Sequence, residues 1–106
     1  MKEVTYNDVI FKIGKNAEEN WELLNENEQY IWFHLESFPS CYVICCHEEP
    51  TTEMIINGAK LCKENTKYRN FNNIKISYTP LSNLKKAEKV GSVYIKSKRK
   101  VKKIGV

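Results

Sequence analysis

The chain has 106 residues, of which 42% are hydrophobic and 28% charged, and its formal net charge is +4. This length is short for two domains but sufficient for one domain whose core needs no disulfide or metal support. No apolar run reaches the roughly 18 to 20 residues of a membrane-spanning helix, and residues 1–6 lack the charged-then-apolar pattern of a signal peptide. We therefore expect one monomeric domain in the cytoplasm or the nucleus, without membrane contact.

The first predicted strand covers residues 9–13, where apolar residues occupy every second position until Gly14 ends the run. Asn16 can then cap a helix, and Glu19, three residues further on, can act as its reciprocal capping partner. This pattern predicts a short helix over residues 17–25.

Two β-rich runs follow, at residues 30–35 and 41–46, separated by a turn at residues 38–40 that contains Pro39. They predict an antiparallel pair of central strands. Thr51 or Thr52 then caps a second helix that runs to about residue 65. Its core-facing stripe is Ile55, Ala59 and Cys62, and Gly58 permits a close approach.

Ile74, Ile76 and Tyr78 alternate with polar residues as a half-buried strand that ends at Pro80. After Pro80, apolar residues are interspersed among the lysines as they would be in strands. This pattern predicts a last hairpin that turns near residues 97–99. The fold class that follows is α+β: a single domain, mainly antiparallel sheet with two helices packed on it and a basic C-terminal hairpin.

The charge is distributed unevenly along the chain. Residues 1–84 contain eight Lys or Arg against twelve Asp or Glu, whereas in residues 85–106 only Glu88 opposes nine basic residues. A field of one sign attracts polyanions, and lysines that neutralise phosphates release counterions on binding. A solvated face is the plainer interpretation of such a run, but its strand-like pattern favours a folded basic surface. The basic residues are Lys85, Lys86, Lys89, Lys96, Lys98, Arg99, Lys100, Lys102 and Lys103.

The four cysteines predict neither disulfides nor a metal site. A chain without a secretory signal meets a reducing compartment, where thiols stay free. Cys41, Cys45, Cys46 and His47 do not form a C-x-x-C knuckle, and in a strand Cys46 points away from Cys41 and Cys45. We expect buried apolar thiols, no metal and no cofactor.

Four short motifs occur in order along the chain: Ile13-Gly14-Lys15-Asn16 with Asn20, then Trp32-Phe33-His34, then residues 78–86 (YTPLSNLKK), then Val90-Gly91-Ser92-Val93. In this order and spacing the chain resembles the NFACT-R domain over nearly its whole length. That domain is the RNA-binding module of large proteins of ribosome-associated quality control, and it also occurs alone or with a coiled coil in small eukaryotic proteins. The stretch at residues 78–86 is most similar to these small members.

The resemblance implies a single NFACT-R-like nucleic-acid-binding domain over residues 1–106, in standalone form, with transfer or ribosomal RNA as its partner. One departure concerns Tyr42, which stands where the family typically has a second histidine in a Pro-Gly-Ser-His-Val motif. A role that needs imidazole there is in doubt, although a ring able to stack on a base is retained.

Several residues are candidates for RNA contact. Lys15 and Asn16 stand at a strand-to-helix turn, where helix amides favour a phosphate, or they form a plain turn and cap. Trp32 and His34 share one strand face, so they either stack on bases or are buried. The remaining candidates are Tyr42, Ser82, Asn83, Lys85, Lys86, Lys96, Lys98 and Arg99.

Two functions from different classes remain. The preferred one is an RNA-binding module for tRNA or rRNA, linked to translation or ribosome-associated quality control, with the ribosome as a further partner. The alternative is a protein-interaction adaptor, or a domain whose basic face binds DNA without selectivity. No enzyme is expected, because the sequence has no paired carboxylates, phosphate-binding glycine loop, nucleophile elbow or metal spacing.

Overall fold

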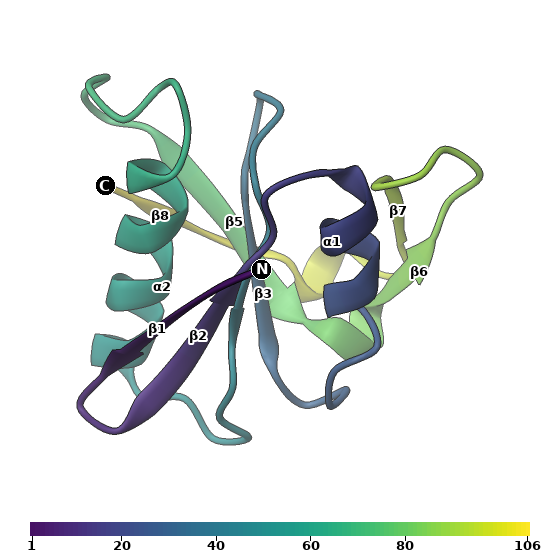
Figure 1. The fold of residues 1–106 in the computed structure, drawn as a ribbon, viewed down its shortest axis with the longest axis horizontal. Coiled ribbons are helices and arrows are strands. Elements are labelled where there is room, and N and C mark those ends of the chain that lie inside the picture. The colour runs from purple at the N-terminus through teal and green to yellow at the C-terminus, as the bar shows by residue number, and fades with distance from the viewer.

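A computed structural model describes all 106 residues as one six-stranded antiparallel sheet with a helix on each face and a small two-stranded sheet beside it (Figure 1). The large sheet has the strand order β1-β2-β4-β3-β5-β8, and the small sheet pairs β6 with β7. The strands are β1 (Lys2–Tyr6), β2 (Val9–Ile13), β3 (Ile31–Leu35), β4 (Val43–Cys45), β5 (Lys75–Pro80), β6 (Leu84–Lys86), β7 (Val93–Ile95) and β8 (Lys102–Gly105). The helices are α1 (Ala17–Leu23) and α2 (Thr52–Glu64), with two 3-10 turns, η1 (Leu81–Asn83) and η2 (Lys98–Lys100). The predicted fold class is confirmed.

The larger core lies between the sheet and α2. Strand residues contribute by their two-residue alternation, so Phe11, Phe33 and Ile76 are fully buried on this face. Ala59 and Cys62 of α2 face them, as the helical stripe predicts. The central pairing of β3 with β4 is antiparallel, as expected.

The second core lies on the opposite face, beneath α1 and the small sheet. It contains Leu23 of α1, Trp32, Tyr42 and Ile44 of the large sheet, and Leu81 and Leu84 near the small sheet. Because Trp32 and Phe33 are neighbours on β3, they point into different cores. The sheet is therefore covered on both faces.

Both helices begin at the capping residues that the sequence predicts. The side chain of Asn16 accepts a hydrogen bond from the amide of Glu19, and that of Thr51 accepts one from Met54. The carboxylate of Glu19 accepts a hydrogen bond from the amide of Lys15 rather than from that of Asn16. The predicted close approach at Gly58 is also confirmed, since a Cβ there would lie 2.4 Å from the ring of Phe33.

The basic C-terminal hairpin exists, but its turn was predicted in the wrong place. β7 pairs with β6, so the hairpin turns at residues 87–92, and η2 occupies the predicted turn. β8 instead extends the large sheet along β5. The side chain of Asn83 explains the separation, because it bonds both the carbonyl and the amide of Ser97 at 2.9 Å and so holds the crossing segment.

Replacing Gly58 by alanine should destabilise the domain by about 1–2 kcal/mol. The added methyl group collides with the buried ring of Phe33, and this overpacking exceeds the gain in helix propensity. Urea unfolding measures the difference, with Asn57→Ala in the same helix as a control. An unchanged or raised free energy of unfolding for Gly58→Ala would contradict the packing described here.

Stability should also fall as the pH drops below 6.5. His34 is half-buried against Trp32, with ring centroids 5.6 Å apart, and burial lowers its pKa below the ordinary value of 6.5. The unfolded chain therefore takes up this proton first, and stability present above pH 6.5 is lost below it. In the His34→Gln variant, the free energy of unfolding measured with urea should change less between pH 7.5 and pH 5.5 than it does in the unaltered protein. An equally steep dependence in the variant would assign the effect to other groups.

Candidate nucleic-acid interface

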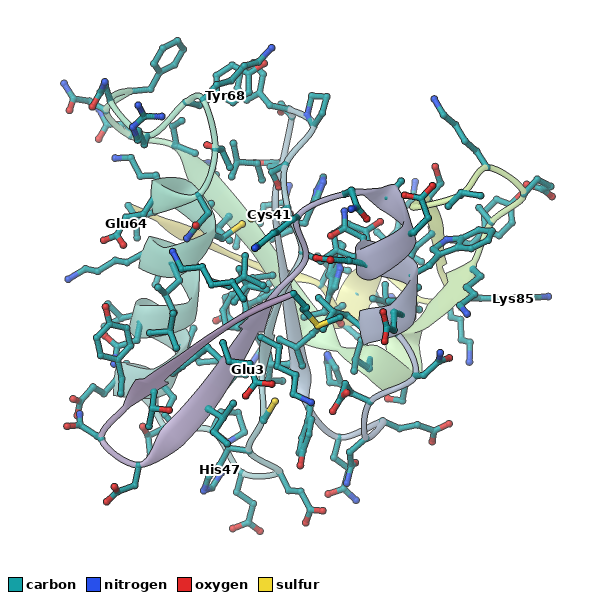
Figure 2. The ribbon with its side chains drawn as sticks, viewed as in Figure 1. Glu3, Cys41, His47, Glu64, Tyr68 and Lys85 are labelled. Atoms are coloured by element: carbon teal, nitrogen blue, oxygen red, sulfur yellow. The ribbon has the colours of Figure 1, made fainter.

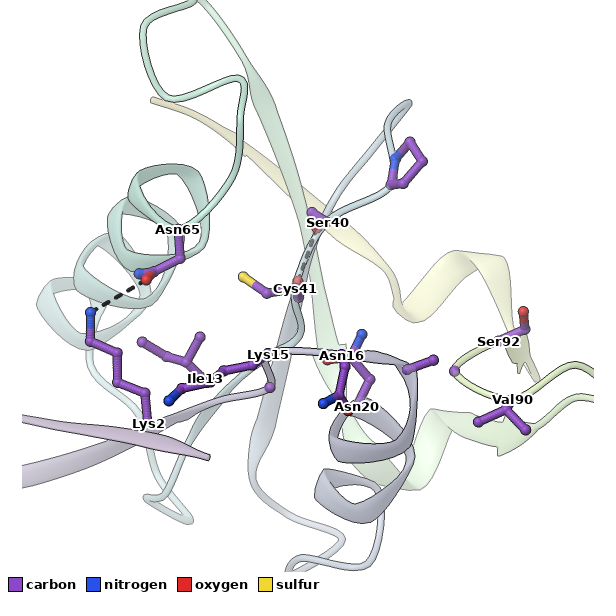
Figure 3. A pocket seen from close by; sticks show the side chains of 14 residues that line it. Lys2, Ile13, Lys15, Asn16, Asn20, Ser40, Cys41, Asn65, Val90 and Ser92 are labelled. Atoms are coloured by element: carbon purple, nitrogen blue, oxygen red, sulfur yellow. Dashed lines mark hydrogen bonds between the residues drawn. The ribbon is translucent and has the colours of Figure 1, made fainter.

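A pocket of about 720 Å³ opens where the first turn of α1 meets the β3–β4 loop, the end of α2 and the turn at residues 87–92 (Figure 3). The first two of these segments are adjacent because of Gly14. The amide of Gly14 donates to the carbonyl of Tyr42 at 3.0 Å, and the side chain of Asn20 accepts from the amide of Tyr42 at 3.1 Å. A Cβ on Gly14 would lie 2.2 Å from Asn20 Oδ1, so this contact requires glycine.

The opposite wall is the turn at residues 87–92, and it is tied to α1 and to the sheet. Gly91 has a φ of +86°, and a Cβ there would lie 2.8 Å from that of Ala17. Tyr42 donates its hydroxyl to the carbonyl of Gly91, and the indole of Trp21 donates to the carbonyl of Ser92 at 2.9 Å. The pocket is therefore held open by contacts between segments far apart in sequence.

The pocket is positive. Lys2 and Lys15 are the only charged residues that line it, and no carboxylate does. The ammonium group of Lys2 lies 3.4 Å from Oδ1 of Asn65, which lines the pocket together with Asn16 and Ser92. Two ammonium groups among amides and a hydroxyl suit a phosphate oxygen.

One helix amide at this site, that of Glu19, already donates to the side chain of Asn16. Glu19 accepts the amide of Lys15 at 2.9 Å and contacts the N-terminal ammonium at 3.2 Å. This carboxylate lies beside the strand-to-helix turn but does not line the pocket, and these hydrogen bonds lower its pKa. The positive charge of the pocket itself comes from the side chains of Lys2 and Lys15.

All four cysteine thiols are free, and no group of three or more metal-binding side chains occurs. Cys41 lines the pocket, and a hydrogen bond with the Cys62 thiol lowers its pKa. Burial raises the pKa of Cys45 to about 12 and that of Cys46 to about 11. The last two thiols are therefore protonated at neutral pH.

Two of the predicted stacking residues are not available to a base. Trp32 is 3% exposed and Tyr42 is 4% exposed, and both belong to the second core. Their rings meet edge to face with centroids 5.3 Å apart, and that of His34 packs against both. Of the two options for Trp32, base stacking or burial, the structure shows burial, because α1 and the small sheet cover that face of the large sheet.

Asn83 is a structural residue rather than an RNA contact. It is 3% exposed, and besides Ser97 its amide reaches the hydroxyl of Thr79 at 3.1 Å. All of these bonds stay within the protein. Its neighbour Ser82 is exposed.

The predicted lysines do not converge on one site. Lys85 and Lys86 are exposed on β6, and Figure 2 shows Lys85 pointing outward from the small sheet. The ammonium group of Lys86 lies 5.5 Å from the centre of the Trp21 ring and 3.5 Å from Asn25 Oδ1. Lys96 is exposed just beyond β7, where its amide bonds the carbonyl of Asn83.

A second basic hollow, of about 650 Å³, is lined by Arg99, Lys100 and Lys102 beside the start of α2. Lys98 is exposed in the same 3-10 turn, η2. Of the predicted residues, only Lys15 and Asn16 line the larger pocket. Lys2 and Asn65 were missed, because only the pairing of β1 with β2 and the end of α2 bring them there.

Neither helix is long and apolar enough to span a membrane. The chain is 33% identical over 104 residues to coiled-coil domain-containing protein 25 of Danio rerio, a match that covers 89% of this chain and 50% of that protein. The chain thus spans about half the length of this curated relative. It also shares its fold with the C-terminal part of the fibronectin/fibrinogen-binding protein of Streptococcus suis, with a TM-score of 0.89 at 24% identity over 98% of this chain and 44% of the other.

The family model described as NFACT protein RNA binding domain matches residues 2–97. This span contains both helices, the small sheet and every element that builds the pocket. The expected resemblance is thereby confirmed, and the chain belongs to the NFACT RNA-binding domain family.

Proposed function

We propose that this domain binds structured RNA, with transfer RNA or ribosomal RNA as its ligand, and that the phosphate backbone binds in the pocket beside α1. The observation that carries the proposal is that Lys2 and Lys15 face a pocket of about 720 Å³ lined by no carboxylate. The family's description as an RNA-binding domain supports the choice of polyanion.

The surrounding charges support the same assignment. Lys85 and Lys86 extend the positive surface along the small sheet, whose turn forms one wall of the pocket. Backbone contacts supply affinity without sequence preference, which suits recognition of a folded RNA by shape. A role in translation or ribosome-associated quality control, in the cytoplasm, follows from such a ligand and is part of the proposal.

Duplex DNA and an acidic protein are the competing partners, and salt dependence combined with competition by duplex DNA tests RNA against them. RNA affinity should fall steeply with salt, because each neutralised phosphate releases counterions. Structured RNA should also compete better than a DNA duplex of equal length, since the A-form helix and its 2′-hydroxyls differ from B-DNA. Equal competition by both would favour unselective DNA binding.

Replacing Lys2 and Lys15 together by alanine should weaken tRNA binding and lower the slope of log affinity against log salt by up to about 2. Both side chains are exposed, so the fold should persist. Fluorescence anisotropy at several salt concentrations measures both effects. The double variant Lys85→Ala, Lys86→Ala is the charge-matched control. It should lose less affinity for tRNA, because these residues lie outside the pocket. A larger loss in the control would move the site to the small sheet.

A further inference from the structure

A cluster of aromatic side chains, which we call the aromatic tip, lies where the β3–β4 loop meets the loop between α2 and β5. It consists of Phe38, Tyr68 and Phe71. The rings of Phe38 and Tyr68 have centroids 4.5 Å apart, and those of Tyr68 and Phe71 are 5.5 Å apart at 75°. Figure 2 shows Tyr68 at this end of the molecule, beyond the end of α2.

The aromatic tip is exposed although its base is anchored. Phe71 is 53% exposed and Phe38 is 39% exposed, whereas Tyr68 is half-buried and packs against the larger core. A group of exposed rings costs solvation free energy, and such apolar patches mark binding sites more often than isolated apolar residues do. The anchored ring of Tyr68 positions the two exposed ones.

The charge around the aromatic tip is positive. Residues 65–87 include no Asp or Glu, and Lys67, Arg69 and Lys75 among them are exposed. The ammonium group of Lys67 lies 5.4 Å from the centre of the Tyr68 ring. Glu36, the one carboxylate that lines a hollow beside Phe38 and Phe71, forms an ion pair with Lys103. Exposed rings among cationic side chains are the kind of surface on which unpaired nucleotides stack.

A hollow of about 270 Å³ lies between the exposed rings. Phe38 and Phe71 line it together with Lys75 and two amide side chains, Asn72 and Asn73. Asn73 has a φ of +59°, a left-handed conformation that asparagine tolerates and that turns the chain toward β5. Amide groups can donate to and accept from the edge of a base that stacks on either ring.

The aromatic tip and the pocket beside α1 are adjacent. They share the β3–β4 loop, since Phe38 lines the hollow and the next three residues, Pro39, Ser40 and Cys41, line the pocket. Lys67 and Arg69 follow Asn65, which also lines the pocket, by two and four positions. A strand whose phosphates occupy the pocket can therefore present its next bases to the tip.

We infer that the aromatic tip is a binding site for unpaired RNA bases, which stack on Phe38 and Phe71 while the neighbouring pocket holds the backbone. The inference rests on the proposed function and deepens it. It assigns the stacking role to side chains other than Trp32 and Tyr42, which the second core buries. The preferred ligand is thus structured RNA with a single-stranded end or loop.

The test compares two RNA hairpins with the same stem, one blunt and one with a single-stranded overhang that carries 2-aminopurine. The unaltered protein should bind the overhang hairpin more tightly and quench its fluorescence by stacking. Phe38→Ala with Phe71→Ala should lose roughly 5- to 150-fold in affinity for the overhang hairpin per stacked base. Its affinity for the blunt hairpin should be unchanged.

Two further variants serve as controls. Tyr94→Ala removes an equally exposed ring, 50% accessible, from the small sheet and should leave both affinities and the quenching unchanged. Phe71→Tyr keeps the ring at the tip and should retain the quenching. Urea unfolding of each variant checks that the fold persists.

The inference is overturned if the double alanine variant retains the quenching, or if it loses affinity equally for both hairpins. In either case RNA binding that still depends on Lys2 and Lys15 would leave the proposed function intact. If the unaltered protein binds neither hairpin, the proposed function and the inference both fail.

Discussion

The contact of Gly14 and Asn20 with Tyr42 is the interaction on which the site depends. Tyr42 directly precedes β4, and both its amide and its carbonyl need hydrogen-bond partners. The amide donates to the side chain of Asn20 in α1, and the carbonyl accepts from the amide of Gly14 at the end of β2. The same tyrosine reaches across with its hydroxyl to Gly91 and fixes the turn of the small sheet. One residue therefore joins the large sheet, α1 and the small sheet, and the pocket is the space left at their junction.

The sheet buries both of its faces, and this explains where aromatic residues can meet a ligand. Trp32, His34 and Tyr42 pack under α1, and Phe33 packs under α2. Residues that belong to motifs of the family thus build the scaffold. In the proposed function, contact with RNA therefore falls to side chains that remain exposed at the ends of the strands and in the loops between them.

The sequence predicts most elements because their signals are local: the alternation in β2, the N-caps of both helices and the proline turn between β3 and β4. It misses β1, whose hairpin turn at Asn7 and Asp8 has φ values of 49° and 66°, the left-handed pair typical of a two-residue turn. It also misplaces the last hairpin, because the choice of β6 or β8 as the partner of β7 depends on Asn83 and on the free edge of β5. The pocket could be predicted only in part, since Lys2, Lys15 and Asn65 are brought together by tertiary packing.

In the proposed function, RNA enters the pocket beside α1. Titration of the ¹⁵N-labelled domain with tRNA, followed by heteronuclear NMR, tests it residue by residue. If RNA binds there, the amide signals of the pocket residues shift first and shift most, and added salt reverses those shifts. These residues are Lys2, Lys15, Asn16, Gly91 and Ser92. Shifts confined to η2 and the hollow around Arg99, with the pocket residues unmoved, would contradict it.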